Sequence, residues 1–209
     1  MSLFSKEFKK KLIEKIGEIE SLSGVEVVIV VARKSANYIY LNLLGGIFFS
    51  FLSLTYLMFT PVEFPDEIVY IGTILGFIIG YLLLLISDIA RLFVSKKTLQ
   101  RNAEIYGRAL FQKGKIYETE TRQGILIYVS NFEKTTLFLE DKNVMKRIPF
   151  YELNIIKERL NCIFDKYSSH KTAQNFLLEL DNLKQISAKF IPITEDDVNE
   201  IPDDLEILL

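Results

Sequence analysis

The sequence predicts an α/β protein: a layered α/β sandwich that is interrupted, after its first strand, by a hairpin of two transmembrane helices. Three observations support this fold class. Runs of β-branched residues such as "VEVVIVV" alternate with stretches whose apolar residues recur at helical spacing. Two long apolar stretches begin soon after the first of these runs. The other strand patterns follow only after both stretches, which indicates an insertion into one domain.

The chain opens with a predicted amphipathic helix over residues 4–22. Its apolar residues, among them Phe8, Leu12 and Ile16, recur at helical spacing, and lysines fill the opposite face. After "SLSG" comes "GVEVVIVVA" at 24–32. A continuous β-branched run of this kind is typical of a strand that is buried on both faces of a sheet.

Two apolar stretches, at about 38–59 and 68–94, are long enough to cross a bilayer. The hydrocarbon core is about 30 Å thick and a helix rises about 1.5 Å per residue, so roughly 20 apolar residues suffice. The charges Asp88 and Arg91 lie near the end of the second stretch, and "TPVEFPDE", with two prolines, separates the stretches. A pair of buried core helices is the alternative, but a domain of this size could not cover two helices that are apolar all round.

Basic residues flank the predicted spans on one side only. Arg33 and Lys34 precede the first span and several more follow the second, whereas the connecting loop carries only acids. The excess of basic residues in cytoplasmic loops therefore predicts that both termini are cytoplasmic and that the loop lies outside.

Gly72, Gly76 and Gly80 occupy every fourth position of the second span. Such a face lets another helix approach closely. The first span is the expected partner because the pairing then needs no further subunit, and a homo-oligomer through the same face is the alternative.

The remaining patterns complete one discontinuous domain. The strands at 124–130 and 135–141 are separated by "NFEK" and are expected to form a hairpin. The predicted helices cover residues 96–114, 149–167 and 170–190. The predicted organisation is therefore a cytoplasmic domain at 1–37 and 95–192, a transmembrane hairpin at 38–94 and an acidic tail at 193–209.

Composition excludes several classes of function. With 25 basic against 27 acidic residues, the chain lacks the basic excess of a nucleic-acid-binding protein. His170 is the only histidine and Cys162 the only cysteine, so neither a histidine-rich metal site nor an intrachain disulfide is expected. The chain also contains no P-loop, dinucleotide-binding or nucleophile-elbow motif.

Carboxylates around the third predicted strand are the candidates for a chemical site. Glu133, Glu140 and Asp141 supply hard oxygen ligands of the kind that bind Ca²⁺ or Mg²⁺. Arg122 is near enough in sequence to orient a phosphate or to pair with these acids. The alternative for these acids is that they are simply solvated, as charged residues at strand ends commonly are. Ser130, at the end of a predicted strand, could belong to the site or could simply form the turn that follows.

The tail "ITEDDVNEIPDDLEILL" carries seven acids and no base, and it ends in apolar residues. A free acidic tail is one interpretation, and docking of the apolar ending into a groove of a partner is the other.

The order of these signals resembles the TPM domain family, specifically its membrane-embedded bacterial branch. The similarity covers roughly residues 5–192 and includes "LSGVEVVIVVARKSANY", the spanning pair, "RALFQKGKIYETETRQGILIYVSNFEKTTLFLEDKNVMKRIPFYEL" and "LKQISAKFIP". The resemblance implies an α/β/α sandwich, the bacterial inner membrane, and a site that includes Glu133 and Asp141. Family members have assembly, repair or accessory roles beside membrane complexes, and some thylakoid relatives are associated with acid phosphatase activity and calcium binding.

Two functions follow as hypotheses. The leading one is a non-catalytic, membrane-anchored accessory protein, without a cofactor, whose cytoplasmic domain helps to assemble, stabilise or regulate a larger membrane complex. The alternative is an acid-phosphatase-like hydrolase assisted by Ca²⁺ or Mg²⁺, with Glu133 and Asp141 as ligands.

Overall fold

The chain forms two compact units in the computed structural model, which describes residues 3, 5–119, 121–166, 169–194 and 207–208. One unit contains Met1–Ser35 and Gln100–Leu209, and the other contains Ala36–Leu99. The inserted unit is thus a few residues longer at each end than the predicted hairpin at 38–94.

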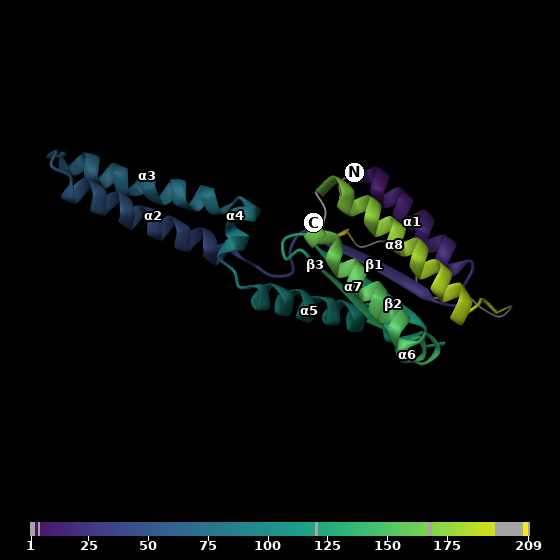
Figure 1. The fold of residues 1–209 in the computed structure, drawn as a ribbon. Coiled ribbons are helices and arrows are strands. Elements are labelled where there is room, and N and C mark those ends of the chain that lie inside the picture. Colours follow the sequence, from purple (N-terminus) through teal and green to yellow (C-terminus); the bar gives the residue numbers. More distant parts are fainter. Residues whose placement is uncertain (1–2, 4, 120, 167–168, 195–206, 209) are drawn as a thin grey trace. The chain divides into compact units, whose positions relative to one another are not determined.

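The first unit is built on a small mixed sheet (Figure 1). Strands β1 (Glu26–Ala32) and β2 (Gly124–Ser130) are parallel and pair along all seven residues, and β3 (Thr135–Glu140) runs antiparallel to β2. A two-residue strand, β4 (Ile207–Leu208), lies parallel to β1 on its other edge. The predicted pairing of the second strand with both the first and the third is confirmed.

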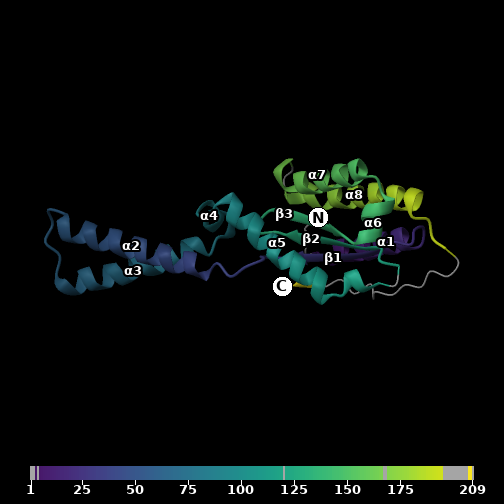
Figure 2. The same cartoon turned by 90° about the horizontal axis from the view of Figure 1, so that it is seen from below.

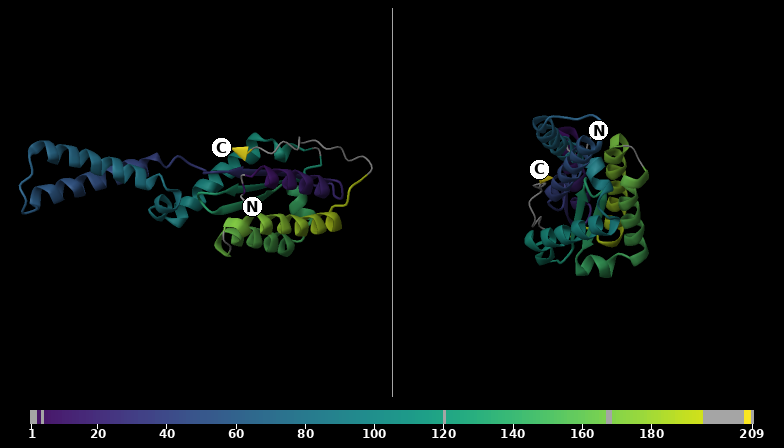
Figure 3. Two further views of the ribbon diagram at one scale, coloured as in Figure 1. Left: turned by 90° about the horizontal axis from the view of Figure 1, so that it is seen from above. Right: turned by 90° about the vertical axis from the view of Figure 1, so that its left-hand side faces the viewer.

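Helices cover both faces of this sheet, and Figure 2 shows α7 and α8 on the opposite side from α5. Val27, Ile29 and Val31 of β1 point into a core with α1 (Lys6–Glu20), α7 (Phe150–Lys166) and α8 (Ser169–Phe190). The alternate residues Val30 and Ala32 belong to a second core beside α5 (Lys96–Lys113). The two views in Figure 3 show the same arrangement of helices around the sheet.

Both faces of β1 and β2 are therefore apolar, as their β-branched runs predict. The connection between two parallel strands must cross from one end of the sheet to the other, and α5 lies in that crossover, after the inserted unit. Two short helices were not predicted: the 3₁₀ helix η1 (Ile116–Glu118) and α6 (Lys142–Arg147). Each is too short to show a helical period in sequence.

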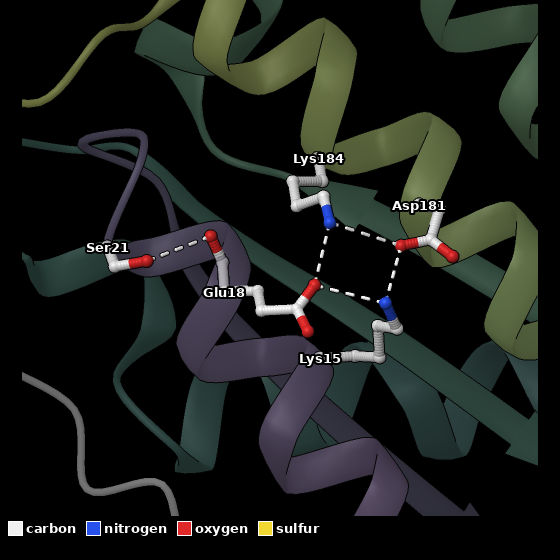
Figure 4. A network of polar contacts seen from close by, with 5 residues as sticks. All are labelled: Lys15, Glu18, Ser21, Asp181 and Lys184. Atoms are coloured by element: carbon white, nitrogen blue, oxygen red, sulfur yellow. Dashed lines mark hydrogen bonds and ion pairs between the residues drawn. The ribbon is translucent and has the colours of Figure 1, made fainter.

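A ring of ion pairs links α1 to α8 (Figure 4). Lys15 Nζ lies 2.7 Å from Asp181 Oδ1 and 3.0 Å from Glu18 Oε2, and Lys184 Nζ lies 2.6 Å from the same Glu18 oxygen. The hydrogen bond from Lys184 lowers the pKa of Glu18. Burial opposes ionisation of Asp181, but Lys15 and Lys184 outweigh it and lower the pKa of this carboxyl as well.

The inserted unit contains the antiparallel helices α2 (Ile39–Phe59) and α3 (Asp66–Leu84) and the short helix α4 (Ser87–Leu92). Helices α2 and α3 are long and apolar enough to cross a membrane, and only 17% of each apolar stretch is buried within the structure. This low burial differs from that of a core helix in a soluble protein, which is mostly covered.

The second predicted span, 68–94, is not one continuous helix. Helix α3 ends at Leu84, and Ile86 has an extended backbone (φ −71°, ψ 108°) that interrupts the helical hydrogen-bond pattern. Asp88 and Arg91 consequently lie in α4 instead of at the end of a long span.

Glycines allow the backbones of α2 and α3 to approach each other closely. A Cβ atom added to Gly80 would lie 2.3 Å from the carbonyl oxygen of Gly45, and one added to Gly76 would lie 2.8 Å from that of Phe49. A Cβ atom added to Gly72 would lie 2.5 Å from Cδ1 of the Leu57 side chain. The three glycines of the second span thus face the first span of the same chain, and Ser53 adds a hydrogen bond from its hydroxyl to the Gly72 carbonyl at 2.8 Å.

Candidate functional site

A buried polar cluster lies where β1 and β2 end. Glu133, in the turn between β2 and β3, is 3% exposed. Its Oε1 accepts the Ser35 backbone N–H at 2.8 Å, and its Oε2 accepts the Ser130 hydroxyl. Ser35 Oγ in turn shares a hydrogen bond of 2.8 Å with the Tyr128 hydroxyl. Two strand ends and one turn are therefore joined through a single carboxylate.

Backbone hydrogen bonds strengthen this junction. The N–H groups of Asn131 and Phe132, in the turn, donate to the carbonyls of Ala32 and Arg33 at 3.0 and 2.9 Å. The segment that follows β1 is thus fixed along the β2–β3 turn as far as Ser35, the last residue before the inserted unit. This cluster anchors the chain at the point where it leaves the sheet.

Tyr128 is the largest fully buried side chain of the cluster. Burial raises its pKa to about 12, although its hydrogen bonds with Ser35 and Ser130 oppose the shift. The phenol therefore stays protonated and acts as a neutral hydrogen-bonding group. Both of the Glu133 oxygens already have protein partners, so this carboxylate is suited to holding Ser35 rather than a ligand.

The structure does not bring Glu133 and Asp141 together. Glu133 precedes β3 and Asp141 follows it, so the six residues of the strand separate them by roughly 17–20 Å at about 3.4 Å per residue. One cation cannot contact both carboxylates, and the expectation that they share a site is corrected. Arg122 lies at the Asp141 end, where its carbonyl accepts the Asn143 N–H at 3.1 Å, and its side chain is exposed.

Asp141 caps α6 and belongs to a second polar cluster. Its Oδ1 accepts the Lys142 N–H at 2.6 Å, while its Oδ2 is buried without a hydrogen-bond partner. The side-chain oxygens of Thr119 and Gln123, which lie within a few residues of the same strand end, are likewise buried and without a hydrogen-bond partner. Such atoms are costly unless a water or an ion satisfies them.

Gly124 lies at the centre of this second cluster. It pairs with Glu26 of β1 on one side, and its carbonyl accepts the Asp141 N–H at 2.9 Å on the other. By strand alternation, Glu26 and Asp141 lie on the α5 face of the sheet, two strand spacings or about 10 Å apart. The Ile116 carbonyl oxygen covers the glycine between them, 2.3 Å from where a Cβ would be. We call Glu26, Ile116, Thr119, Gln123 and Asp141 the Gly124 cluster.

The chemistry of the Gly124 cluster is that of hard oxygen donors. Carboxylate, amide, hydroxyl and backbone carbonyl oxygens are the ligands that Ca²⁺ and Mg²⁺ prefer. Within the described part of the chain, no group of three or more His, Cys, Asp or Glu side chains could hold a metal. A cation here would consequently rely on two carboxylates and on neutral oxygens.

Sequence reasoning identified Asp141 but missed Glu26, Thr119 and Gln123 as its neighbours. Their proximity depends on strand order, which brings the starts of β1 and β2 beside the end of β3. It also missed Ser35 and Tyr128 as partners of Glu133. Ser35 lies in "LSGVEVVIVVARKSANY", a stretch that carries part of the family resemblance but to which no role was assigned.

Comparisons with known proteins show the fold alone. No protein-family model and no curated protein matches the chain. A solved structure that is similar is the NMR structure of the BA42 protein from the psychrophilic bacterium Bizionia argentinensis, with a TM-score of 0.56 at 13% sequence identity. The match covers 96% of this chain and 92% of that one. At this identity the similarity supports a common fold and carries no function.

Proposed function

We propose that this chain is a membrane-anchored accessory protein of the bacterial cytoplasmic membrane. Helices α2 and α3 cross the bilayer, both termini are cytoplasmic, and the α/β unit binds a larger membrane protein complex and helps to assemble, stabilise or regulate it. The observation that carries this proposal is the hairpin of two long apolar helices, inserted between β1 and β2 and left largely uncovered by the chain itself.

The outward surface of the hairpin suits lipid rather than water. Phe48, Phe51 and Phe59 of α2 are 63%, 69% and 85% exposed, and Ile71 and Ile79 of α3 are more than half exposed. Soluble proteins rarely leave a continuous apolar surface of this extent uncovered. The basic residues that flank the two spans favour a cytoplasmic α/β unit.

The α/β unit offers a surface for a protein partner between α6 and α7. Met145, Phe150 and Tyr151 are 53%, 76% and 60% exposed, and Lys146 and Arg147 between them are also exposed. Methionine, aromatic residues and arginine are the types enriched in protein interfaces. We call these five residues the α6–α7 patch and assign the binding of the partner complex to it.

Copurification from a mild detergent tests this function. The wild-type chain is expected to carry a defined set of membrane proteins, and Phe150→Ser/Tyr151→Ser is expected to lose them while the chain stays folded. The matched control is Leu178→Ser, which changes an equally exposed apolar residue of α8 (58% exposed) and should retain the partners. A wild-type chain that purifies alone, or equal recovery of partners from all three proteins, would contradict the proposal.

A second candidate function is supported by three members of the Gly124 cluster, since side-chain oxygens of Thr119, Gln123 and Asp141 are buried without a hydrogen-bond partner. A Ca²⁺ or Mg²⁺ ion held there by Asp141 and the neighbouring oxygens would polarise a phosphoryl group and favour its hydrolysis. Exposed Arg122, beside the cluster, would orient the phosphate. This is the acid-phosphatase-like alternative, with Asp141 in the role of ligand and Glu133 outside the site.

The alternative is tested by cation binding and by hydrolysis of p-nitrophenyl phosphate. Asp141→Asn should abolish both without unfolding the chain, because the amide can still cap α6. Glu140→Gln is the matched control, since Glu140 is the neighbouring acid but pairs with Lys157 of α7, 2.5 Å away on the other face of the sheet. Hydrolysis that survives Asp141→Asn, or that is absent from the wild-type chain, would exclude this function.

A further inference from the structure

The edge of β1 that faces away from β2 carries a row of backbone groups that do not pair with β2. The Glu26 N–H donates to the Gln123 carbonyl, so the even-numbered residues of β1 direct their polar groups toward β2. Successive residues of a strand point to opposite edges, and Val27, Ile29 and Val31 therefore present their N–H and C=O groups to the outer edge. An edge of this kind is a template for one more strand.

The chain itself closes the beginning of this edge. The Val27 N–H donates to Glu20 Oε1 at 3.0 Å, and the Gly24 N–H, just before the strand, donates to the Ile191 carbonyl at 3.0 Å. An added strand is consequently restricted to the later half of β1.

The later half is occupied by the C-terminal residues of the chain. Ile207 and Leu208, which form β4, pair in parallel with Val31 and Ala32. Val31 and Ala32 are 0% and 2% exposed, so both faces of the sheet are apolar at this point. The sequence at 207–209 is uncharged, although seven acids lie between residues 195 and 206. The residues that pair with β1, Ile207 and Leu208, thus lie in the uncharged end of a sequence that is otherwise acidic.

We propose that the outer edge of β1 is a strand-addition site and that Ile207 and Leu208, the C-terminal residues of the same chain that form β4, are its resident, displaceable occupant. An extended apolar segment of a partner can add to the sheet there only when the C-terminal segment leaves. Strand β4 is then an intramolecular cap on an interaction surface. This inference does not depend on the membrane location of α2 and α3 or on the α6–α7 patch.

The geometry favours exchange over permanent closure. β4 contributes two residue pairs, whereas β1 and β2 share seven. Main-chain pairing of two residues is weak, and the tether to the rest of the chain compensates by holding the segment at an effective concentration of about millimolar. A partner segment that pairs with Ile29 as well as Val31 gains contacts that β4 lacks.

Peptide binding tests the proposal with two proteins in detergent micelles: the full chain and a variant that ends at Pro202. The probe is a fluorescent peptide of sequence DDLEILL, which copies residues 203–209. The truncated chain should bind the peptide. The full chain should bind the peptide at least about tenfold more weakly, because its own C-terminal residues compete for the same edge of β1. A peptide with proline in place of its sixth residue, the counterpart of Leu208, should not bind, since in this parallel register the Leu208 N–H faces the Val31 carbonyl and proline lacks that donor. Equal binding by the two proteins, or no binding by the truncated chain, would overturn the proposal.

Hydrogen exchange provides a second measurement in the full-length chain. Leu208→Pro, which removes the N–H that faces the Val31 carbonyl, should accelerate exchange of the Val31 amide while leaving exchange in α1 and α8 unchanged. This variant keeps every other residue of the tail, so it decides the question even if truncation destabilises the fold. Unchanged exchange at Val31 would show that the segment does not cap β1.

Discussion

Removing the Glu133 carboxylate should destabilise the α/β unit strongly. In Glu133→Ala, the Ser35 N–H and the Ser130 hydroxyl both lose their acceptor in a buried site. Each unsatisfied buried group costs roughly 1–3 kcal/mol, so the expected loss in the free energy of unfolding is about 2–6 kcal/mol. Glu133→Gln should lose about half of this or less, because its amide oxygen can still accept from Ser35 and the Ser130 hydroxyl can accept from the new amide.

Urea unfolding in detergent micelles, followed by circular dichroism, measures these losses. Amide exchange at Ser35 provides a local control, since its N–H is held by Glu133 directly. A Glu133→Ala variant within about 0.5 kcal/mol of the wild-type chain, the range of an ordinary surface change, would refute the anchoring role. A Glu133→Gln variant of unchanged stability that no longer binds Ca²⁺ or Mg²⁺ would instead restore Glu133 as a ligand.

Three further predictions concern helix packing and titration. Gly80→Ala should destabilise the packing of α2 against α3 by about 1–3 kcal/mol in an SDS titration, because its Cβ would meet the Gly45 carbonyl. Gly17→Ala, a control with open space around it, should stabilise α1 by up to about 1 kcal/mol. Equal effects of the two variants would contradict close contact between α2 and α3 at Gly80. The pKa of Tyr128 is raised to about 12, against 10 in the unfolded chain, so this residue contributes stability that is present below pH 10 and lost between pH 10 and 12. Over this range the free energy of unfolding should fall by about 2–3 kcal/mol more in the wild-type chain than in Tyr128→Phe. The lowered pKa of Asp181 gives stability that is lost as the pH falls below about 4. The stability of Asp181→Asn should therefore depend less on pH in acid than that of the wild-type chain. Identical acid unfolding profiles would show that the ring of ion pairs does not cause this loss of stability.

Much of the fold is predictable from the sequence because its strands have the strongest local signals. The runs at 124–130 and 135–141 are β-branched and apolar, and the structure places β2 and β3 there almost residue for residue. The helices that pack on the sheet have a clear 3.6-residue period. The break after Leu84 was not predictable in this way, because the apolar composition continues through Ile86 and only the backbone conformation changes.

The site was harder to predict because it depends on which strand ends meet. Glu133 and Asp141 are eight residues apart in sequence, and nearness in sequence suggested a shared site. A strand lies between them, and an extended strand separates its two ends instead of joining them. That separation follows from the predicted strand itself. The neighbours of Asp141 at Gly124 could not be predicted, since strand order is required to place Glu26 beside them.

Cysteine labelling in intact cells tests the central claim, that the hairpin crosses the membrane and leaves the α/β unit in the cytoplasm. Cys162, the only cysteine, lies in α7 and is partly exposed. Val62, 59% exposed between α2 and α3, is the position for a reporter in the Cys162→Ser/Val62→Cys variant. A membrane-impermeant maleimide should label the Val62→Cys variant in intact spheroplasts and should label Cys162 only after lysis. Labelling of Cys162 before lysis, or recovery of the chain in the soluble fraction, would contradict the account.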